Sequence, residues 1–110
     1  MSSAGRFGLS QATIDKLNGV FSQHESIDVV LIYGSRAKGS YRRGSDIDLT
    51  IKGRKIAFLD FMRLENEIDD LMLPYTVDIS QYLDITNQDL IAHIDRVGIP
   101  IYRRGESAPA

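Results

Sequence analysis

Residues 29–51 read VVLIYGSRAKGSYRRGSDIDLTI, and this stretch decides the fold. Its opening run, residues 29–33, is apolar and has the length of a buried strand. Gly34 and Ser35 end that run, a short helical turn over 36–38 follows, and then comes a loop with a glycine at each end. From Asp46 to Lys52 polar and apolar residues alternate, which predicts a second strand with one apolar face.

The flanking residues predict a small α/β (α+β) domain built around these two strands. Upstream, Ser10 is placed to cap a helix, and the first strand extends back to Ile27. Downstream we expect a helix over 56–73, a strand over 75–80, a helix from 86 or 87 to 97 and a short edge strand over 99–102. This order gives a mixed sheet with helices packed on one face and the other face uncovered.

Apolar residues at helical spacing indicate which sides of the two downstream helices face the core. The inner face of the helix over 56–73 is expected to carry Leu59, Met62, Ile68, Leu71 and Met72, and Pro74 should stop it. The inner face of the last helix is expected to carry Leu90, Ile91, Ile94 and Val97. Gly98 suits the position just after that helix, where a left-handed backbone is common.

Length and composition predict one domain without cysteine chemistry. The 110 residues, 43% of them hydrophobic, can close a single core over residues 9–102, with flexible termini at 1–8 and 103–110. The absence of cysteine excludes disulfides, thiolate metal sites and cysteine nucleophiles. No apolar run reaches the roughly 18–20 residues of a membrane span, and the first residues lack a secretory signal, so we expect a cytoplasmic protein without membrane contact.

The charges are unevenly distributed along the chain. Residues 34–55 contain seven basic and two acidic side chains, whereas residues 56–95 contain one basic and nine acidic ones. Basic residues around two isolated carboxylates indicate a polyanionic ligand, although they are equally compatible with solvated loops. The net charge of −2 does not favour direct binding to nucleic acid.

Three aspartates are expected on the uncovered face of the sheet. Asp46 and Asp48 lie two residues apart on one strand, roughly 6.6 Å along it, and Asp78 has the same phase on the next strand. Grouped carboxylates repel one another unless a hard cation such as Mg²⁺ lies between them. Two such ions could clamp the oxygens of a phosphoryl displacement. The alternative is the solvated side of a half-exposed strand.

Gly34 and Ser35 lie where a phosphate could bind. Glycine after a buried strand allows close approach of a ligand, and the following turn offers free backbone N–H groups. Ser35 adds a hydroxyl, and Arg36 and Lys38 add positive charge nearby. Taken alone, the same residues are compatible with an ordinary helix cap.

Together, Gly34-Ser35, the pair Asp46 and Asp48 and the later Asp78 resemble the signature of the DNA polymerase β-like nucleotidyltransferase superfamily. The form YGSRAKGSYRRGSDIDLTI is similar to its minimal nucleotidyltransferase (MNT) branch. The resemblance implies the small polymerase-β-like core. It implies that Gly34 and Ser35 hold the triphosphate of ATP, with Arg36, Lys38, Arg42 and Arg43 as further candidates. It also implies that Asp46, Asp48 and Asp78 are catalytic and bind two Mg²⁺ ions.

MNT proteins form the antitoxin half of modules whose toxin is a HEPN protein. The resemblance therefore implies a Mg²⁺-dependent transfer of a nucleotide, AMP from ATP, to a hydroxyl of a HEPN partner. Two alternatives stay open: a binding antitoxin or subunit that has the fold without the activity, and transfer to a small molecule.

The two histidines and the acidic helix carry weaker signals. We expect His93 to pack at a surface or interface, and His24 to place a favourable charge at the end of the first helix. Glu65, Glu67, Asp69 and Asp70 are expected to form a solvated helix face, with a docking surface for a basic partner as the alternative.

Overall fold

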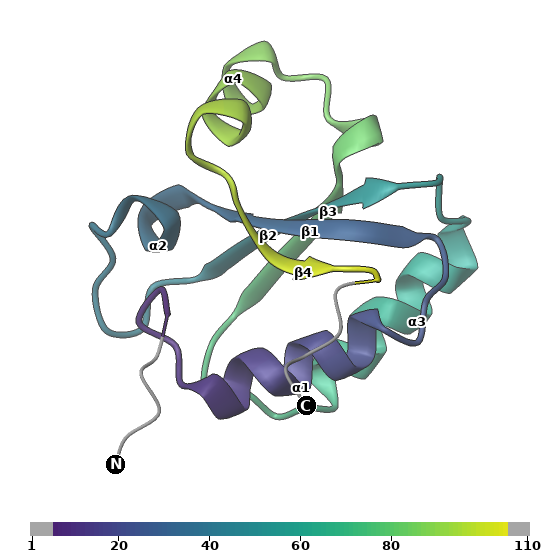
Figure 1. Cartoon of the computed structure of the whole chain (residues 1–110), viewed down its shortest axis with the longest axis horizontal. Coiled ribbons are helices and arrows are strands. Elements are labelled where there is room, and N and C mark those ends of the chain that lie inside the picture. Colours follow the sequence, from purple (N-terminus) through teal and green to yellow (C-terminus); the bar gives the residue numbers. More distant parts are fainter. Residues whose placement is uncertain (1–5, 106–110) are drawn as a thin grey trace.

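The computed structural model describes residues 6–105, which form a four-stranded mixed sheet with helices on both sides (Figure 1). The sheet order is β3-β2-β1-β4; β1 is antiparallel to both of its neighbours, and β2 and β3 are parallel. The elements are α1 (Gln11–Phe21), β1 (Ile27–Tyr33), α2 (Gly34–Lys38), β2 (Ile47–Gly53), α3 (Phe58–Asp69), β3 (Val77–Gln81), the 3₁₀ turn η1 (Tyr82–Asp84), α4 (Gln88–Val97) and β4 (Ile99–Arg103). This is the α/β class that the sequence predicts.

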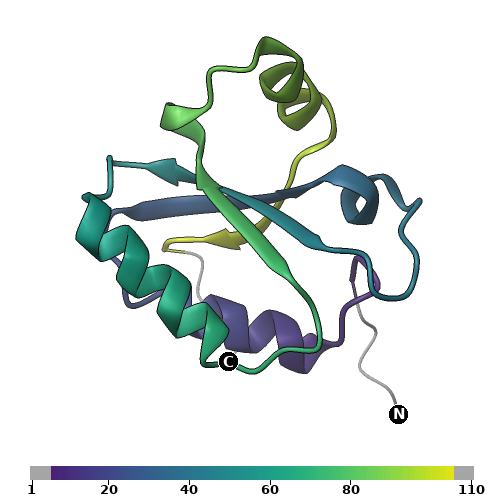
Figure 2. The ribbon, with the colours of Figure 1, turned by 180° about the vertical axis from the view of Figure 1, so that it is seen from behind.

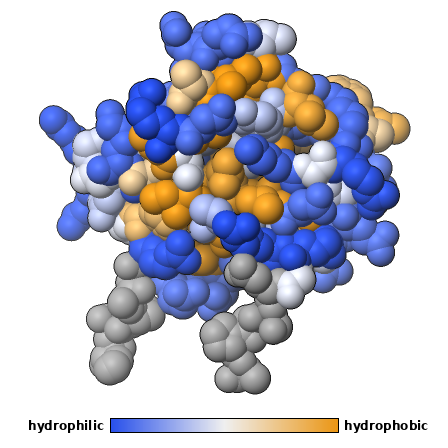
Figure 3. All heavy atoms as spheres, turned by 45° about the horizontal axis from the view of Figure 1, so that its top comes forward, coloured by the Kyte–Doolittle hydropathy of each residue, from blue (hydrophilic) through white to orange (hydrophobic). Residues whose placement is uncertain are grey.

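One face of the sheet packs against α1 and α3, whereas α4 and η1 lie on the opposite side (Figures 1 and 2). The core lies in the first of these layers. Its fully buried members include Leu17 and Phe21 from α1, Leu49 from β2 and Leu64 from α3. The face expected to be uncovered is therefore approached at one end by α4. Figure 3 shows apolar side chains gathered on this side, over α4 and the strands below it.

The predicted start of the first helix is confirmed, and of the two starts predicted for the last helix the structure has the one at Asn87. Ser10 Oγ accepts a hydrogen bond from the Thr13 N–H at 3.1 Å, and Asn87 Oδ1 accepts one from the Leu90 N–H at 3.1 Å. Gly98 is different: its backbone is extended rather than left-handed. A Cβ there would lie 2.6 Å from the Ile94 carbonyl oxygen, so close packing is the reason for glycine.

Helix α3 is shorter than predicted, and the expected inner face is wrong at three positions. It ends at Asp69 rather than near Pro74. Leu59 and Met72 are 75% and 84% exposed, and Met62 is exposed too. The residue that fills the core in their place is Leu64. Apolar residues on two sides of this helix made its buried side ambiguous from spacing alone.

The ends of the described chain are tied to the domain. Near the N-terminal end, Arg36 Nη1 donates to the Phe7 carbonyl oxygen at 2.8 Å, and near the C-terminal end the Arg104 N–H donates to the Asp28 carbonyl oxygen at 2.8 Å. The sequence predicts flexible termini at 1–8 and 103–110. Of these, residues 1–5 and 106–110 lie outside the described residues. Within residues 6–105, no helix has the length and apolar character needed to cross a membrane.

Candidate active site

Three polar side chains lie in a row across the sheet, on the face opposite the core. The register pairs Tyr33 at the end of β1 with Asp48 on β2, and Asp48 with Asp78 on β3. Because side chains alternate along each strand, these three project from the same face. Asp46 immediately precedes β2 and is exposed. The register therefore brings two of the three predicted carboxylates directly opposite each other.

Gly34 makes room for the Asp48 carboxylate. Its φ of +74° lies in the left-handed region that favours glycine, and a Cβ at this position would overlap Asp48 Oδ2. Any other residue would push this carboxylate away or strain the turn between β1 and α2. Gly34 thus joins the predicted phosphate loop and the predicted metal-binding strand into one site.

The electrostatics of the row disfavour negative charge. Burial raises the pKa of Asp48, and the nearby carboxylates of Asp78 and Asp46 raise it further. Burial likewise raises the pKa of Tyr33, with contributions from the charges of Asp78 and Asp48. A cation at this place would relieve the repulsion.

The carboxylates of Asp46, Asp48 and Asp78 are donors that fit Mg²⁺, which prefers carboxylate oxygens. The side chains do not converge on a metal position, since no group of three His, Asp or Glu within residues 6–105 has that spacing. Two observations support Mg²⁺ here. Asp48 is repelled by the carboxylates of Asp78 and Asp46, and Asp48 and Asp78 lie on the same face of the sheet.

Ser35 and Lys38 are accessible beside the row. Ser35 is half-buried, and its hydroxyl makes no hydrogen bond within the described part of the chain. Lys38 is exposed at the end of α2, with no ion-pair partner among residues 6–105. Both side chains are available to a ligand at the start of α2.

Arg36, in contrast, is only 3% exposed and does not lie free for a phosphate. Its Nε and Nη2 donate to the Ser45 carbonyl oxygen at 3.1 and 2.8 Å, and its Nη1 donates to that of Phe7 at 2.8 Å. The guanidinium also lies against the rings of Tyr41 and Tyr75, at 5.3 and 4.9 Å from their centroids. This placement does not support the expected phosphate contact; it gives Arg36 a positioning role next to Asp46.

His93 on α4 belongs to the site, although the sequence pointed to packing. Its Nε2 accepts a hydrogen bond from the Gly34 N–H at 3.1 Å, and its ring meets that of Tyr33 edge to face at 6.1 Å. Its spacing from Leu90 and Val97 was the available signal, because it places His93 on the sheet side of α4. His24 lies elsewhere, 2.6 Å from Glu67 between the end of α1 and α3.

Comparisons with known proteins agree with this geometry. Residues 15–107 match the family described as Polymerase beta, Nucleotidyltransferase. A comparison with curated protein sequences gives no significant match.

Among solved structures, the fold is similar to a toxin–antitoxin complex crystallised with AMP-PNP, with 17% identity over 89% of this chain and 77% of that chain and a TM-score of 0.65. It is similar to the MntA–HepT toxin–antitoxin, with 12% identity over 86% and 73% of the two chains and a TM-score of 0.63. A third similar structure is the MNT antitoxin in complex with the tri-AMPylated HEPN toxin of Shewanella oneidensis, with 13% identity, coverage of 84% and 71% and a TM-score of 0.62. At these identities the likeness shows the fold.

Proposed function

The chain belongs to the polymerase beta nucleotidyltransferase family, and we propose that it transfers AMP from ATP to a hydroxyl of a HEPN-family partner protein. The observation that carries the proposal is that the predicted phosphate loop and the predicted metal-binding strand meet at one point. Gly34, at the start of the phosphate loop, lies against Asp48, which in turn lies opposite Asp78. A site of this kind can hold a triphosphate and its counterions together.

The chain's own residues divide into those that bind phosphate and those that handle charge. The Ser35 hydroxyl and the exposed Lys38 would donate to the triphosphate. Asp46, Asp48 and Asp78 would hold Mg²⁺, which supplies neutralisation of the phosphate charge when bound. His93 and the Tyr33 ring support the Gly34 turn from the α4 side.

In the proposed reaction, a new bond forms between the acceptor oxygen and the α-phosphorus of ATP. The bond between that phosphorus and the bridging oxygen breaks, and pyrophosphate leaves. The hydroxyl proton goes to a carboxylate oxygen of Asp78, the exposed member of the row. The products are an AMP ester on the acceptor and free pyrophosphate.

A protein acceptor is favoured by the open position of the site at one edge of the sheet. Asp78 lies exposed on β3, at an edge of the sheet, where a second protein could reach it. The structurally similar complexes pair MNT antitoxins with HEPN toxins, one of them AMPylated. We extend that pairing to this chain as a proposal. The predicted location of the protein is the cytoplasm.

The proposal is tested with purified protein, Mg²⁺, a HEPN-family protein from the same genome and ATP labelled at either the α- or the γ-phosphate. We expect the α-label, and not the γ-label, on the HEPN protein, and no label with Asp46→Asn. Thermal melts of Asp46→Asn establish that the variant folds. Tight binding of the two proteins without any label transfer would instead support a binding antitoxin.

A further inference from the structure

The two edges of the sheet are protected to different degrees. Edge strand β4 contains Pro100, and its register with β1 shifts between Val30 and Leu31. Proline and irregular register are devices that prevent an edge from pairing with another strand. Edge strand β3, with the sequence VDISQ, has neither, and its register with β2 is regular. Figure 2 shows β3 in front, with no other element of the described chain across it.

The backbone of β3 has groups free to pair. The Thr76 carbonyl oxygen accepts from the Ile47 N–H at 2.9 Å, so alternate residues from Thr76 onward direct their backbone groups at β2. The intervening residues, Val77 and Ile79, therefore direct their N–H and C=O groups to the free edge. An incoming extended segment could pair with them.

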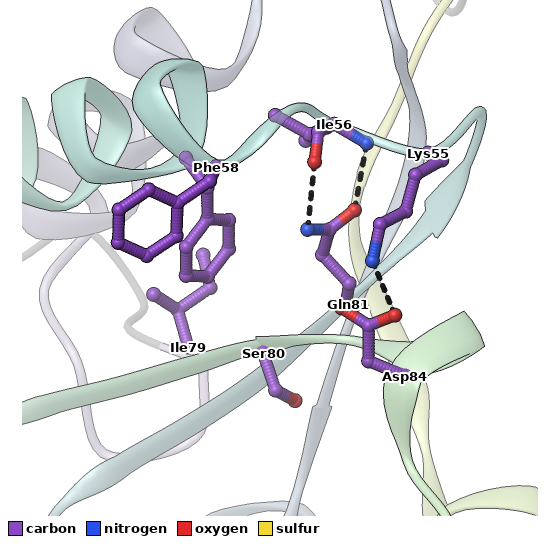
Figure 4. A pocket seen from close by; sticks show the side chains of 8 residues that line it. Lys55, Ile56, Phe58, Ile79, Ser80, Gln81 and Asp84 are labelled. Carbon is purple, nitrogen blue, oxygen red and sulfur yellow. Dashed lines mark hydrogen bonds and ion pairs between the residues drawn. The ribbon is translucent and has the colours of Figure 1, made fainter.

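A groove follows this edge, between β3 and α3. It begins at a pocket of about 330 Å³ lined by Phe58, Phe61 and Ile79 and closed at the far end by the Lys55–Asp84 ion pair (Figure 4). Two further hollows, of about 220 and 240 Å³, continue it past Val77. The first pocket is mainly apolar, whereas the two further hollows combine apolar side chains such as Ile68 and Val77 with a mostly polar lining.

The walls of the groove are acidic. Asp69 lines both further hollows and Glu65 lines one of them, and both residues are exposed on α3. Neither carboxylate has an ion pair or hydrogen bond within residues 6–105. A mainly apolar pocket next to two unpaired carboxylates is complementary to a segment that carries both apolar and basic side chains.

We propose that the β3 edge and this groove dock an extended segment of the acceptor protein, which adds to the sheet as a fifth strand. Its apolar side chains enter the groove, and its Lys or Arg side chains face Glu65 and Asp69. This mode of binding combines main-chain pairing with side-chain pockets. The inference rests on the proposed function for the identity of the partner.

The same pairing would present the acceptor hydroxyl to the site. Because side chains alternate along a strand, those that flank the groove-facing residues point to the sheet face that bears Asp78. A residue directly opposite Asp78 would have its Cβ about 4.5–5.5 Å away, within reach of a tyrosine hydroxyl. Docking and delivery of the substrate are thus one event.

The test is the double variant Glu65→Lys/Asp69→Lys, assayed for complex formation with, and AMP transfer to, the HEPN-family protein used above. Asp60→Lys is the matched control, because Asp60 is exposed on α3 but lines a separate hollow on the α1 side. We expect the double variant to bind the partner about 10- to 30-fold more weakly and the control to bind normally. Binding of a fluorescent ATP analogue should be unchanged in both. Hydrogen exchange at the Val77 and Ile79 amides should slow in the wild-type complex.

Failure of the docking proposal is distinguishable from failure of the proposed function. If the wild type transfers AMP while the double variant binds and reacts equally well, the groove is not the docking site. Unchanged exchange at Val77 and Ile79 in the complex would refute strand addition, for example in favour of a docked helix. Absence of transfer by the wild type would instead overturn the proposed function.

Discussion

Replacing Arg36 separates a positioning role from a phosphate-binding role. If Arg36 were a phosphate ligand, its loss would weaken ATP binding and leave the nucleotide-free protein as stable as before. The structure predicts the opposite order of effects. The Arg36 guanidinium binds the carbonyl oxygens of Phe7 and Ser45 and lies against two tyrosine rings, so its loss should destabilise the protein without nucleotide.

The magnitude follows from these contacts. A hydrogen bond from a charged donor is worth about 1.5–3 kcal/mol, and a cation–π contact about 0.5–1 kcal/mol. Arg36→Lys keeps the charge and can reach one carbonyl oxygen, so we expect it to lower the free energy of unfolding by about 2–3 kcal/mol. Arg36→Met removes the hydrogen bonds to both carbonyl oxygens and both ring contacts, and should cost at least about 4 kcal/mol, a large part of the stability of a small domain.

Urea denaturation of the nucleotide-free protein measures the effect. With a slope of about 1–3 kcal/mol per molar urea, Arg36→Lys should lower the midpoint by about 0.7–3 M. Arg42→Lys is the control, because Arg42 is exposed in the loop after α2 and this change should alter stability by less than about 0.5 kcal/mol. An Arg36→Lys variant as stable as the wild type, with weaker ATP binding, would refute the positioning role.

Three further variants test other parts of the site. Asp48→Asn should raise the free energy of unfolding at neutral pH, because burial and neighbouring carboxylates raise the Asp48 pKa. Since the folded state holds this proton more tightly than the unfolded state, the gain should shrink as the pH falls towards the ordinary carboxyl range, which melts at several pH values would show. Ser35→Ala should weaken ATP binding by about 1.5–3 kcal/mol in calorimetry, with unchanged melting. His93→Ala should lower the free energy of unfolding by about 1–2 kcal/mol in urea, because the Gly34 N–H loses its acceptor.

The sequence predicts those parts of the fold that depend on neighbouring residues. The caps at Ser10 and Asn87 act within three residues; Ser10 was predicted as a cap, and Asn87 was one of two predicted helix starts. The alternation along β2 and β3 placed Asp48 and Asp78 on one face, and the register shows that they lie opposite each other. The resemblance to the polymerase beta nucleotidyltransferases, stated from residues 29–51, is confirmed by the family match over residues 15–107.

Contacts between distant parts of the chain could not be predicted in the same way. Arg36 is buried because Phe7, 29 residues earlier, and Tyr75 on the approach to β3 close around its guanidinium. His93 enters the site because α4 returns to Gly34, 59 residues away in sequence. Which side of α3 is buried depended on the position of the sheet, and so Leu64 was missed.

The mass of the intact HEPN partner tests the central claim most directly. After incubation with this chain, ATP and Mg²⁺, we predict that the partner gains one or more increments of about 329 Da, the mass expected for each transferred AMP. With Asp46→Asn in place of the wild type, the partner's mass should stay unchanged. A partner that binds the wild-type chain and keeps its original mass under these conditions would contradict nucleotide transfer.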